Sequence, residues 1–335
     1  MANYSECSGN TCRCLVCPHK CNISTGSSGL CAVRQNEGNG TVALTTFGLV
    51  SGYGSDPIEK KPLYHFYPGS TILSVGSYGC NLSCDFCQNW HISNGRNPMP
   101  GKRMKPEQIV SDALDIPGNT GVAFTYNEPV VWIEFMLATA GKARESGLAT
   151  VMVSNGYVNE KPLEDILNVV DAFNIDLKFF SNESYRKYTG GTLRPVLRSL
   201  SQIASSGRHL EVTTLVIPGL NDSDDEIKDI AAWIASECGR DTPLHLSRYH
   251  PAHKRTTGPT AVGKLVELHR LASESLSYVY IGNAYSPGLS DTRCPGCGTT
   301  VTTRTGYITD FQNLTDSGKC SRCGHTVYRH FTSPG

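Results

Sequence analysis

Three cysteines lie close together in the segment Cys80-Asn-Leu-Ser-Cys84-Asp-Phe-Cys87, with C-x3-C-x2-C spacing. Three thiolates in one short loop can hold three irons of a [4Fe–4S] cluster, whereas a fully ligated cluster needs four. The fourth iron would then keep an open position, which distinguishes reactive metal sites from closed structural ones. A zinc loop that takes a distant fourth ligand, or three unrelated buried thiols, would give the same triplet, so the surrounding sequence has to distinguish them.

The residues before the triplet favour the reactive site. Thr71–Gly79 (TILSVGSYG) is an apolar run that ends in glycine, so it predicts a strand with the cysteines on the loop that follows. Open sheets and barrels place their sites at the C-terminal ends of their strands. We therefore interpret the triplet as the ligand set of an open cluster.

Polar residues follow the next three predicted strands. Glu128 comes before a proline after the second strand, and its carboxylate could accept hydrogen bonds from a ligand ammonium or simply begin a helix. Ser154 and Asn155 follow the third strand. Asp176 and Lys178 end the fourth and lie on one face of it, because strand side chains alternate with period two. Buried charges are costly unless they bind a ligand or each other, so either a site or a mutual ion pair is expected here.

A second group of cysteines lies near the C-terminus. Cys294-Pro-Gly-Cys297-Gly and Cys320-Ser-Arg-Cys323-Gly are two C-x2-C-G knuckles separated by 22 residues. This pattern predicts a zinc ribbon, with a closed, tetrahedral and structural Zn²⁺ site. Rubredoxin-type iron is the alternative.

A third group lies near the N-terminus and comprises Cys14, Cys17, Cys21 and Cys31. Four thiolates could hold Zn²⁺ or a second Fe–S cluster, and the spacing does not choose between them, although zinc is slightly favoured. His19 could replace one of the cysteines.

Composition limits the class of protein. The chain has 335 residues, fourteen cysteines and a formal net charge of zero, with no run of Lys and Arg that would mark a nucleic-acid surface. Neither a signal peptide nor an apolar run of about 18 residues is visible, so we expect no membrane association and a cytoplasmic protein. An open iron–sulfur cluster would make the protein oxygen-sensitive. Many cysteines without an export signal favour metal binding over disulfides. Cys7, Cys12 and Cys238 remain outside the three groups, and Cys238 is expected to be core.

The pattern from Thr71 onwards alternates between strand and helix. The predicted strands are Thr71–Gly79, Gly121–Tyr126, Ala149–Ser154, Ala172–Lys178, Leu210–Ile217 and Leu244–Tyr249, with a seventh at Tyr278–Ile281. The predicted helices are Pro106–Asp115, Val130–Ser146, Pro162–Val170, Leu193–Ser206, Asp224–Cys238 and Ala261–Ser275, and Ser223 with Glu226 predicts a capping box before the fifth. Short apolar strands suit a parallel sheet that is buried on both faces.

These elements predict an α/β fold, a (β/α)6 partial TIM barrel. We expect an N-terminal metal-binding segment and lead-in over residues 1–70, with a short hairpin around Thr41–Val50, then the barrel over 71–287 and a zinc ribbon over 288–335.

The triplet, with an aromatic residue just before its third cysteine, resembles the signature of the radical S-adenosylmethionine (radical SAM) superfamily. In that superfamily the amino and carboxylate groups of SAM chelate the open iron. One electron from the cluster splits the sulfonium into methionine and a 5′-deoxyadenosyl radical, which abstracts hydrogen from a substrate. The resemblance therefore implies a [4Fe–4S] cluster and S-adenosylmethionine as cofactors.

Longer motifs resemble one family, the radical SAM enzyme of the AmmeMemoRadiSam system, which is related to the pyruvate formate-lyase activating enzymes. They extend over roughly residues 14 to 325. The motifs are Cys17-Pro-His19-x-Cys21, Gly29-x-Cys31-x-Val-Arg34, Asp56-Pro-Ile-Glu-Lys-Lys-Pro-Leu-Tyr-His65-Phe, Gly79-Cys80-Asn-Leu-x-Cys84-x-Phe-Cys87-Gln-Asn-Trp90, Phe124-Thr-Tyr-Asn-Glu-Pro129, Asn174-Ile-Asp-Leu-Lys178 and Tyr280-Ile-Gly-Asn283.

The resemblance implies roles for single residues. Phe86 would flank the adenine and Glu128 would meet the SAM amino group. The residues that match other positions around SAM in the activating enzymes are Ser154, Asp176, Lys178 and His250. A lone histidine at a strand end such as His250 is as often structural as functional.

Three departures from the related patterns stand out. Tyr126 and Asn127 occupy the positions of the two glycines in the superfamily's Gly-Gly-Glu-Pro pattern, which puts the local backbone approach in doubt. Val153 stands where the activating enzymes carry an aspartate. The approach to the cluster also lacks the arginine that is typical of glycyl-radical activases.

Three hypotheses follow. The first is a radical SAM enzyme that acts on an unidentified small molecule or protein, with an electron donor such as flavodoxin or ferredoxin and with Memo-like and Ammecr-like partner proteins implied by the resemblance. The second is an activase that installs a glycyl radical on a partner enzyme, which the missing arginine and the two extra metal modules disfavour. The third is a non-catalytic metal-binding adaptor or nucleic-acid binder, which the polar residues at successive strand ends disfavour.

Overall fold

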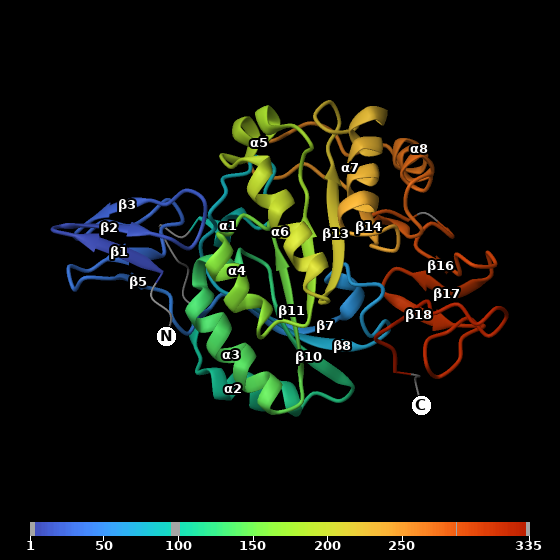
Figure 1. The fold of residues 1–335 in the computed structure, drawn as a ribbon, viewed down its shortest axis with the longest axis horizontal. Helices are drawn as coiled ribbons and strands as arrows, with labels where there is room; N and C mark the ends of the chain where they lie inside the picture. Colours follow the sequence, from blue (N-terminus) through green and yellow to red (C-terminus); the bar gives the residue numbers. More distant parts are fainter. Residues whose placement is uncertain (1–3, 95–100, 286, 333–335) are drawn as a thin grey trace.

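The computed structural model describes residues 4–94, 101–285 and 287–332 of the chain. Its centre is an eight-stranded sheet with the order β15-β14-β13-β12-β11-β10-β8-β7 (Figure 1). The strands are β7 (Gly52–Pro57), β8 (Thr71–Gly76), β10 (Asn119–Phe124), β11 (Ala149–Ser154), β12 (Ala172–Asp176), β13 (His209–Val216), β14 (Leu244–Arg248) and β15 (Val279–Gly282). All pairs are parallel except β7 with β8, so the sheet is open at β7 and β15.

Helices connect the parallel strands and cover the outer side of the sheet (Figure 1). They are α2 (Pro106–Leu114), α3 (Ile133–Glu145), α4 (Glu160–Leu167), α5 (Asn182–Thr189), α6 (Leu193–Ser205), α7 (Asp224–Glu237) and α8 (Val262–Ala272). The predicted α/β architecture is confirmed. The sequence did not predict α5, and the long helix expected from Val130 begins instead with a 3-10 turn over Pro129–Trp132. Ser223 caps α7 as predicted, but the Glu226 carboxylate accepts a hydrogen bond from the Phe180 N–H and does not complete the box.

A segment between β7 and β8 fills the lower half of the sheet's concave side. Ile58, Leu63 and Phe66 pack against the first residues of the strands, including Ile72 and Ala172. Burying such side chains contributes about 1.5–3 kcal/mol each. The apolar filling occupies the amino-terminal half of the strands, which leaves the carboxyl-terminal half for a site.

The N-terminal part forms small antiparallel sheets: β1 (Ser5–Ser8), β2 (Thr11–Cys14) and β3 (Asn22–Ser24) in one, β4 (Arg34–Asn36) with β5 (Val42–Leu44) in another. The hairpin predicted around Thr41–Val50 is wrong, because the two strands of this segment do not pair with each other. β5 pairs with β4, and β6 (Leu49–Val50) pairs with β9 (Lys102–Arg103), which is distant in the sequence.

One disulfide corrects the expectation that the cysteines bind metal and form no disulfides. Cys7 and Cys12 lie opposite each other in the β1–β2 pair, and their sulfurs are bonded. Cross-strand neighbours bring Cβ atoms within reach of a disulfide, which the cysteine count could not reveal.

The C-terminal ribbon, β16 (Thr292–Arg293), β17 (Thr300–Thr305) and β18 (Ile308–Phe311), packs on the open edge of the sheet beside β15. Tyr64 and Tyr280 share an apolar cluster with Val301 and Tyr328, and the Arg304 guanidinium lies 4.2 Å from the centre of the Tyr64 ring. Figure 1 shows the N-terminal sheet and this ribbon at opposite ends of the long axis. Among the described residues, no helix is both long and apolar enough to cross a membrane.

Candidate active site

A cavity of about 480 Å³ opens at the carboxyl-terminal ends of the strands. It brings together nine of the ten residues that the sequence and the resemblance assigned to the cluster and the cofactor. The nine are Cys80, Cys84, Phe86, Cys87, Glu128, Ser154, Asn155, Asp176 and Lys178. The tenth, His250, is exposed and lies outside this lining, with its Nε2 3.5 Å from the Asn283 carbonyl oxygen.

The cysteine loop follows β8 and is held by contacts from three distant segments. Asn127 accepts a hydrogen bond from the Ser77 N–H at 2.9 Å and donates one to the Gly79 carbonyl at 2.8 Å. The Asp85 carboxylate pairs with Arg255 at 2.6 Å. The C-terminal end of α5 accepts hydrogen bonds from the backbone N–H groups of Ser83 and Asp85. These contacts fix the loop that carries the thiolates.

The three thiols line one cavity from a single short loop. Three thiolates so placed can hold three irons of a [4Fe–4S] cluster. Burial raises the pKa of the Cys84 thiol to about 12, although the nearby Lys178 ammonium acts in the opposite direction. Burial also raises the pKa of the Cys80 thiol. Metal binding would have to displace these protons.

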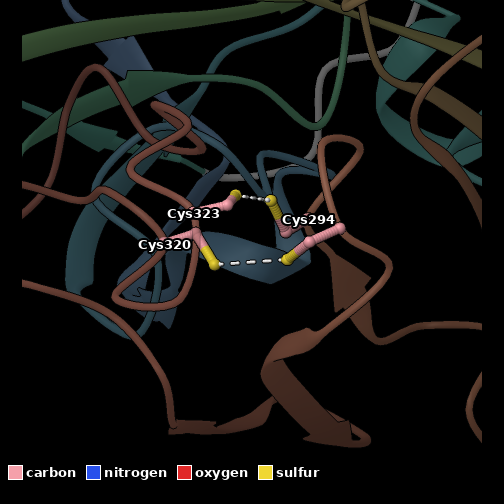
Figure 2. A group of neighbouring side chains, drawn as sticks. Cys294, Cys320 and Cys323 are labelled. Atoms are coloured by element: carbon pink, nitrogen blue, oxygen red, sulfur yellow. Dashed lines mark hydrogen bonds between the residues drawn. The ribbon is translucent and has the colours of Figure 1, made fainter.

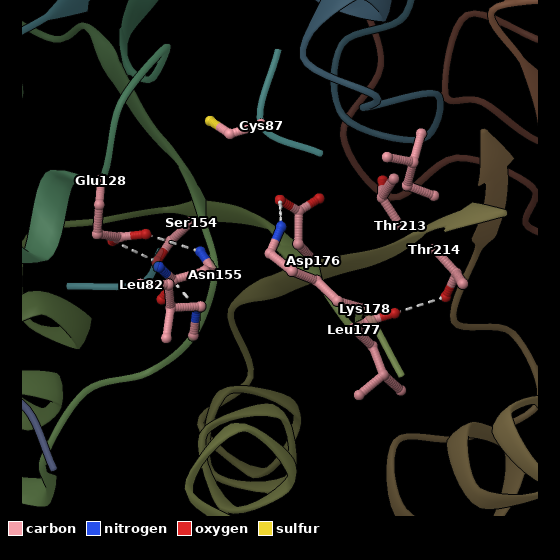
Figure 3. A network of polar contacts seen from close by, with 12 residues as sticks. Leu82, Cys87, Glu128, Ser154, Asn155, Asp176, Leu177, Lys178, Thr213 and Thr214 are labelled. Carbon is pink, nitrogen blue, oxygen red and sulfur yellow. Dashed lines mark hydrogen bonds and ion pairs between the residues drawn. The ribbon is translucent and has the colours of Figure 1, made fainter. Parts of the chain in front are cut away.

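Glu128 is the most constrained polar group of the cavity. Its carboxylate accepts a hydrogen bond from the Val130 N–H at 3.1 Å. It also accepts hydrogen bonds from the Ser154 hydroxyl at 2.7 Å and the Asn155 N–H at 2.9 Å (Figure 3). Burial raises the pKa of Glu128 to about 7, although these hydrogen bonds act in the opposite direction. Glu128 therefore begins the turn before α3, as one alternative held, and it also lines the cavity. Its contact with a ligand ammonium stays a prediction.

Asp176 and Lys178 face the same cavity from the end of β12 (Figure 3). The predicted shared face is confirmed, and the two side chains form an ion pair at 2.8 Å. Burial alone would lower the pKa of Lys178, but the Asp176 carboxylate holds it above its ordinary value. The ammonium thus stays charged beside the cysteine loop, while the Asn155 amide points at the Cys80 sulfur from 3.7 Å.

The backbone conformation of Tyr126 bears on the departure from the superfamily's Gly-Gly-Glu-Pro pattern. Its backbone φ is +70°, in the left-handed region that a bulky side chain rarely adopts, so the tyrosine keeps the conformation of a glycine. Its ring packs against Gly52 and Gly76, where an added Cβ would lie 2.6 and 2.9 Å from ring atoms. Its hydroxyl donates to Asp56 at 2.7 Å. Tyr126 therefore lines the cavity with its backbone in the left-handed region.

A second wall of the cavity comes from residues that the sequence analysis did not assign. Lys61, Tyr64 and His245 line it, together with Tyr307 from the ribbon. The His245 Nε2 lies 2.6 Å from the buried Glu211 carboxylate, which also accepts the backbone N–H groups of Tyr64 and His65. Burial would raise the pKa of Glu211, but its histidine neighbours hold it well below its usual range. The Asp56–Phe66 motif, which entered the sequence analysis as part of the family resemblance, contains Lys61 and Tyr64 and was the sequence signal for this wall.

The C-terminal cysteines form a separate, closed group. The sulfurs of Cys294, Cys297, Cys320 and Cys323 all lie within 4.8 Å of one another. Cys294 and Cys323 are 3.4 Å apart and Cys297 and Cys320 are 3.7 Å apart (Figure 2). Four sulfurs at about 2.3 Å from one tetrahedral zinc would have similar separations. The grouping agrees with the predicted ribbon, and these residues can hold one metal ion.

The predicted N-terminal group is also assembled, away from the main cavity. Cys14, Cys17, Cys21 and Cys31 line a small cavity of about 20 Å³, and His19 lies in the same lining. The His19 Nε2 is 2.7 Å from the Asn81 carbonyl oxygen, so this histidine is engaged with the cysteine loop.

Comparison with known proteins agrees with this arrangement. Residues 74–234 match the model of the radical SAM superfamily. The chain is 39% identical over 328 residues to an uncharacterized protein of Methanocaldococcus jannaschii, and the match covers 97% of both chains.

Characterised relatives are more distant. The benzylsuccinate synthase activating enzyme of Thauera aromatica is 23% identical over 58% of this chain and 60% of its own length. The pyruvate formate-lyase-activating enzyme of Clostridium pasteurianum is 26% identical over 46% of this chain and 65% of its own. The crystal structure of a radical SAM methyltransferase from Sphaerobacter thermophilus matches with a TM-score of 0.52 and 12% identity, over 66% of this chain and 68% of that one. This likeness supports the fold alone.

Proposed function

Because the chain belongs to the radical SAM superfamily and is homologous to glycyl-radical activating enzymes, we propose that its main cavity is where SAM is cleaved for hydrogen abstraction from a substrate. Cys80, Cys84 and Cys87 would hold three irons of a [4Fe–4S] cluster. The observation that carries the proposal is the single cavity that all three thiols share with Glu128 and the charged end of β12. When bound, the cluster and SAM supply a one-electron cleavage to methionine and a 5′-deoxyadenosyl radical.

The residues of this chain would bind and orient SAM. Glu128, held by three hydrogen bonds, offers an acceptor to the SAM amino group. Phe86 is buried beside the third cysteine and offers an aromatic face to the adenine, and Leu215 lines the same cavity. Ser154, Asn155, Asp176 and Lys178 supply polar contacts for the rest of the molecule.

The second wall of the cavity, with Lys61, Tyr64, His245 and Tyr307, is the proposed substrate side. Lys61 is almost fully buried, pairs with Asp56 at 2.7 Å and lies 4.7 Å from the centre of the Tyr126 ring. With Tyr307 of the ribbon it narrows the cavity and would exclude water from the reacting atoms. The ribbon thus contributes to the site, and we propose that it holds Zn²⁺ at Cys294, Cys297, Cys320 and Cys323.

The test is anaerobic reconstitution of the whole chain. The reduced protein should convert SAM to methionine and 5′-deoxyadenosine, with iron and sulfide bound at the cysteine loop. A reconstituted protein that binds the cluster but leaves SAM intact would contradict the proposal.

The second candidate is a glycyl-radical activase, which the homology to the benzylsuccinate synthase and pyruvate formate-lyase activating enzymes favours. The sequence motifs imply a different candidate, an enzyme that acts together with Memo-like and Ammecr-like proteins. Adding a purified glycyl-radical enzyme, or a purified Memo-like or Ammecr-like protein, to the reduced enzyme and SAM would distinguish the two candidates. A persistent glycyl radical on the partner, seen by EPR, would support the activase. Faster 5′-deoxyadenosine formation with a Memo-like or Ammecr-like protein would support the other.

A further inference from the structure

A second cavity, of about 340 Å³, is lined by β15 with the loop that follows it and by the turn between β17 and β18 of the ribbon. We call it the ribbon cavity. It shares Tyr64, Gly282, Asn283 and Tyr307 with the lining of the main cavity, so the two cavities adjoin. Small-molecule sites have volumes of about 300–1,000 Å³. The ribbon cavity can therefore hold one part of a ligand whose other part lies in the main cavity.

Arg304 brings a positive charge to the ribbon cavity. Among the described residues of this lining it is the only charged one, and it is 7% exposed. Its guanidinium donates hydrogen bonds to the Ser290 carbonyl at 3.0 Å, the Thr292 hydroxyl at 2.8 Å and the Tyr64 carbonyl at 3.1 Å. A guanidinium has five N–H groups, so two remain. One of them is the Nε–H, which forms no hydrogen bond with any residue that the structure describes.

The charge of Arg304 also has no ion-pair partner in the described part of the chain. Asp291 accepts a hydrogen bond from the backbone N–H of Arg304 at 2.9 Å, not from its guanidinium. Glu59 attracts the guanidinium from beyond ion-pair distance, and its Oε1 accepts hydrogen bonds from the Gly69 N–H and the Thr309 hydroxyl. A buried cation is costly unless it is paired. An oxyanion in the ribbon cavity would supply the opposite charge and the missing acceptors together.

The rest of the lining suits an apolar ligand body. Tyr64, Tyr285 and Tyr307 line the ribbon cavity, and Tyr285 is 81% exposed and Tyr307 47% exposed. Exposed large apolar side chains around a cavity are typical of a binding surface. We infer that the ribbon cavity binds the oxyanion group, a carboxylate or a phosphate, of a ligand with an apolar body.

The position of the ribbon cavity connects this ligand to the main cavity. A ligand held at Arg304 would extend past Tyr64 and Tyr307, which line both cavities, towards the cysteine loop. The ligand is then the substrate, a step that rests on the proposed function, whereas oxyanion binding itself does not. Arg304 would select substrates by charge and would take no part in the chemical step.

The first experiment measures the binding of three probes to the full, anaerobically reconstituted chain by calorimetry, at constant ionic strength and without SAM. Benzoate and phenyl phosphate carry an oxyanion, and benzamide is the uncharged match of benzoate. At least one of the two anions should bind about tenfold or more tightly than benzamide. The tighter anion identifies the group as carboxylate or phosphate. Equal affinities for the three probes, or no binding of either anion, would overturn the inference.

The second experiment locates the site. Arg304→Gln should weaken binding of the anion by about ten- to a hundredfold. Because Arg304 also holds Tyr64 to the ribbon, this variant can fail to fold, and Thr305 offers a second test. Thr305 is exposed and lines the ribbon cavity but not the main cavity.

Thr305→Asp places a negative charge in the lining and should weaken anion binding about tenfold, whereas the isosteric Thr305→Asn should bind like wild type. Equal anion affinity in the two Thr305 variants would overturn the inference. Because no SAM is present, oxyanion binding and SAM cleavage can fail separately. Anion binding in a protein that never cleaves SAM would contradict the proposed function and leave the oxyanion site standing.

Discussion

The N-terminal sheet and the C-terminal ribbon lie at opposite ends of the molecule (Figure 1), and a group of four cysteines belongs to each of these parts of the chain. At the C-terminal end the four sulfurs all lie within 4.8 Å of one another, and the ribbon packs on the sheet (Figure 2). At the N-terminal end Cys14, Cys17, Cys21 and Cys31 line a small cavity, and His19 from the same lining bonds the Asn81 carbonyl in the cysteine loop of the main site. The C-terminal group is therefore joined to the sheet by apolar packing, whereas the N-terminal group is joined to the cysteine loop by a hydrogen bond.

The cysteine loop is a third arrangement, with three sulfurs that line the main cavity. Removing one ligand from each kind of site should consequently have different results: loss of chemistry at the loop and loss of stability at the ribbon.

The largest effect should follow from Cys84→Ala. Each thiolate supplies one of only three protein bonds to the cluster, so its loss should abolish SAM cleavage. The free energy of unfolding should change little compared with that of the cluster-free wild type, because the loop is held by Asp85 and Asn127 and not by the sulfur. Product analysis by chromatography and thermal melts of both proteins would measure this. Full SAM cleavage by the variant would remove the loop from the chemistry.

Cys320→Ala should give the opposite pattern. If the four C-terminal cysteines hold Zn²⁺ as proposed, the variant should lose it, and the free energy of unfolding should fall by about 4 kcal/mol. Tyr64 and Tyr280 share the ribbon's apolar cluster, so the loss should extend to the second wall of the cavity. Truncation before the ribbon is a poorer test, because it would expose this cluster. Cys238→Ala is the control, and unchanged zinc content in Cys320→Ala would contradict the assignment.

The sequence predicted the residues around the cysteines well because they obey local rules. Strand alternation placed Asp176 and Lys178 on one face, and the strand-end rule brought Glu128, Ser154 and Asn155 to one cavity. The spacing of the C-terminal knuckles likewise predicted their convergence.

The second wall of the cavity could not be predicted because it depends on contacts between distant segments. Tyr64 and His65 bond Glu211 across more than a hundred residues, and Tyr307 reaches the cavity only because the ribbon packs on the open edge of the sheet. His250 illustrates the same limit, because a strand-end position did not bring its side chain to the cavity, whereas His245 lies there.

Glu128→Gln tests the polar side of the open site without touching a thiolate. A charge-assisted hydrogen bond is worth roughly 1.5–3 kcal/mol, so SAM affinity should fall by about ten- to a hundredfold. The cluster should still assemble. If Glu128 only begins the turn before α3, SAM affinity should stay nearly equal and stability should fall by about 0.3–1 kcal/mol. Anaerobic SAM titrations beside melting curves distinguish the two outcomes.

The smallest effect concerns pH. Burial raises the pKa of Glu128 to about 7. A carboxyl with this pKa is about one tenth ionised at pH 6 and about nine tenths ionised at pH 8, so SAM affinity should rise by up to about tenfold over this range. The folded-state pKa is raised, so the stability contributed by the neutral carboxyl is fully present below about pH 4.5 and is lost as the pH rises through about 7. Glu128→Gln should lack both changes, and any pH dependence that remains in the variant belongs to SAM or to other groups. Parallel pH profiles of SAM affinity in wild type and variant would contradict an ionising Glu128 at this contact.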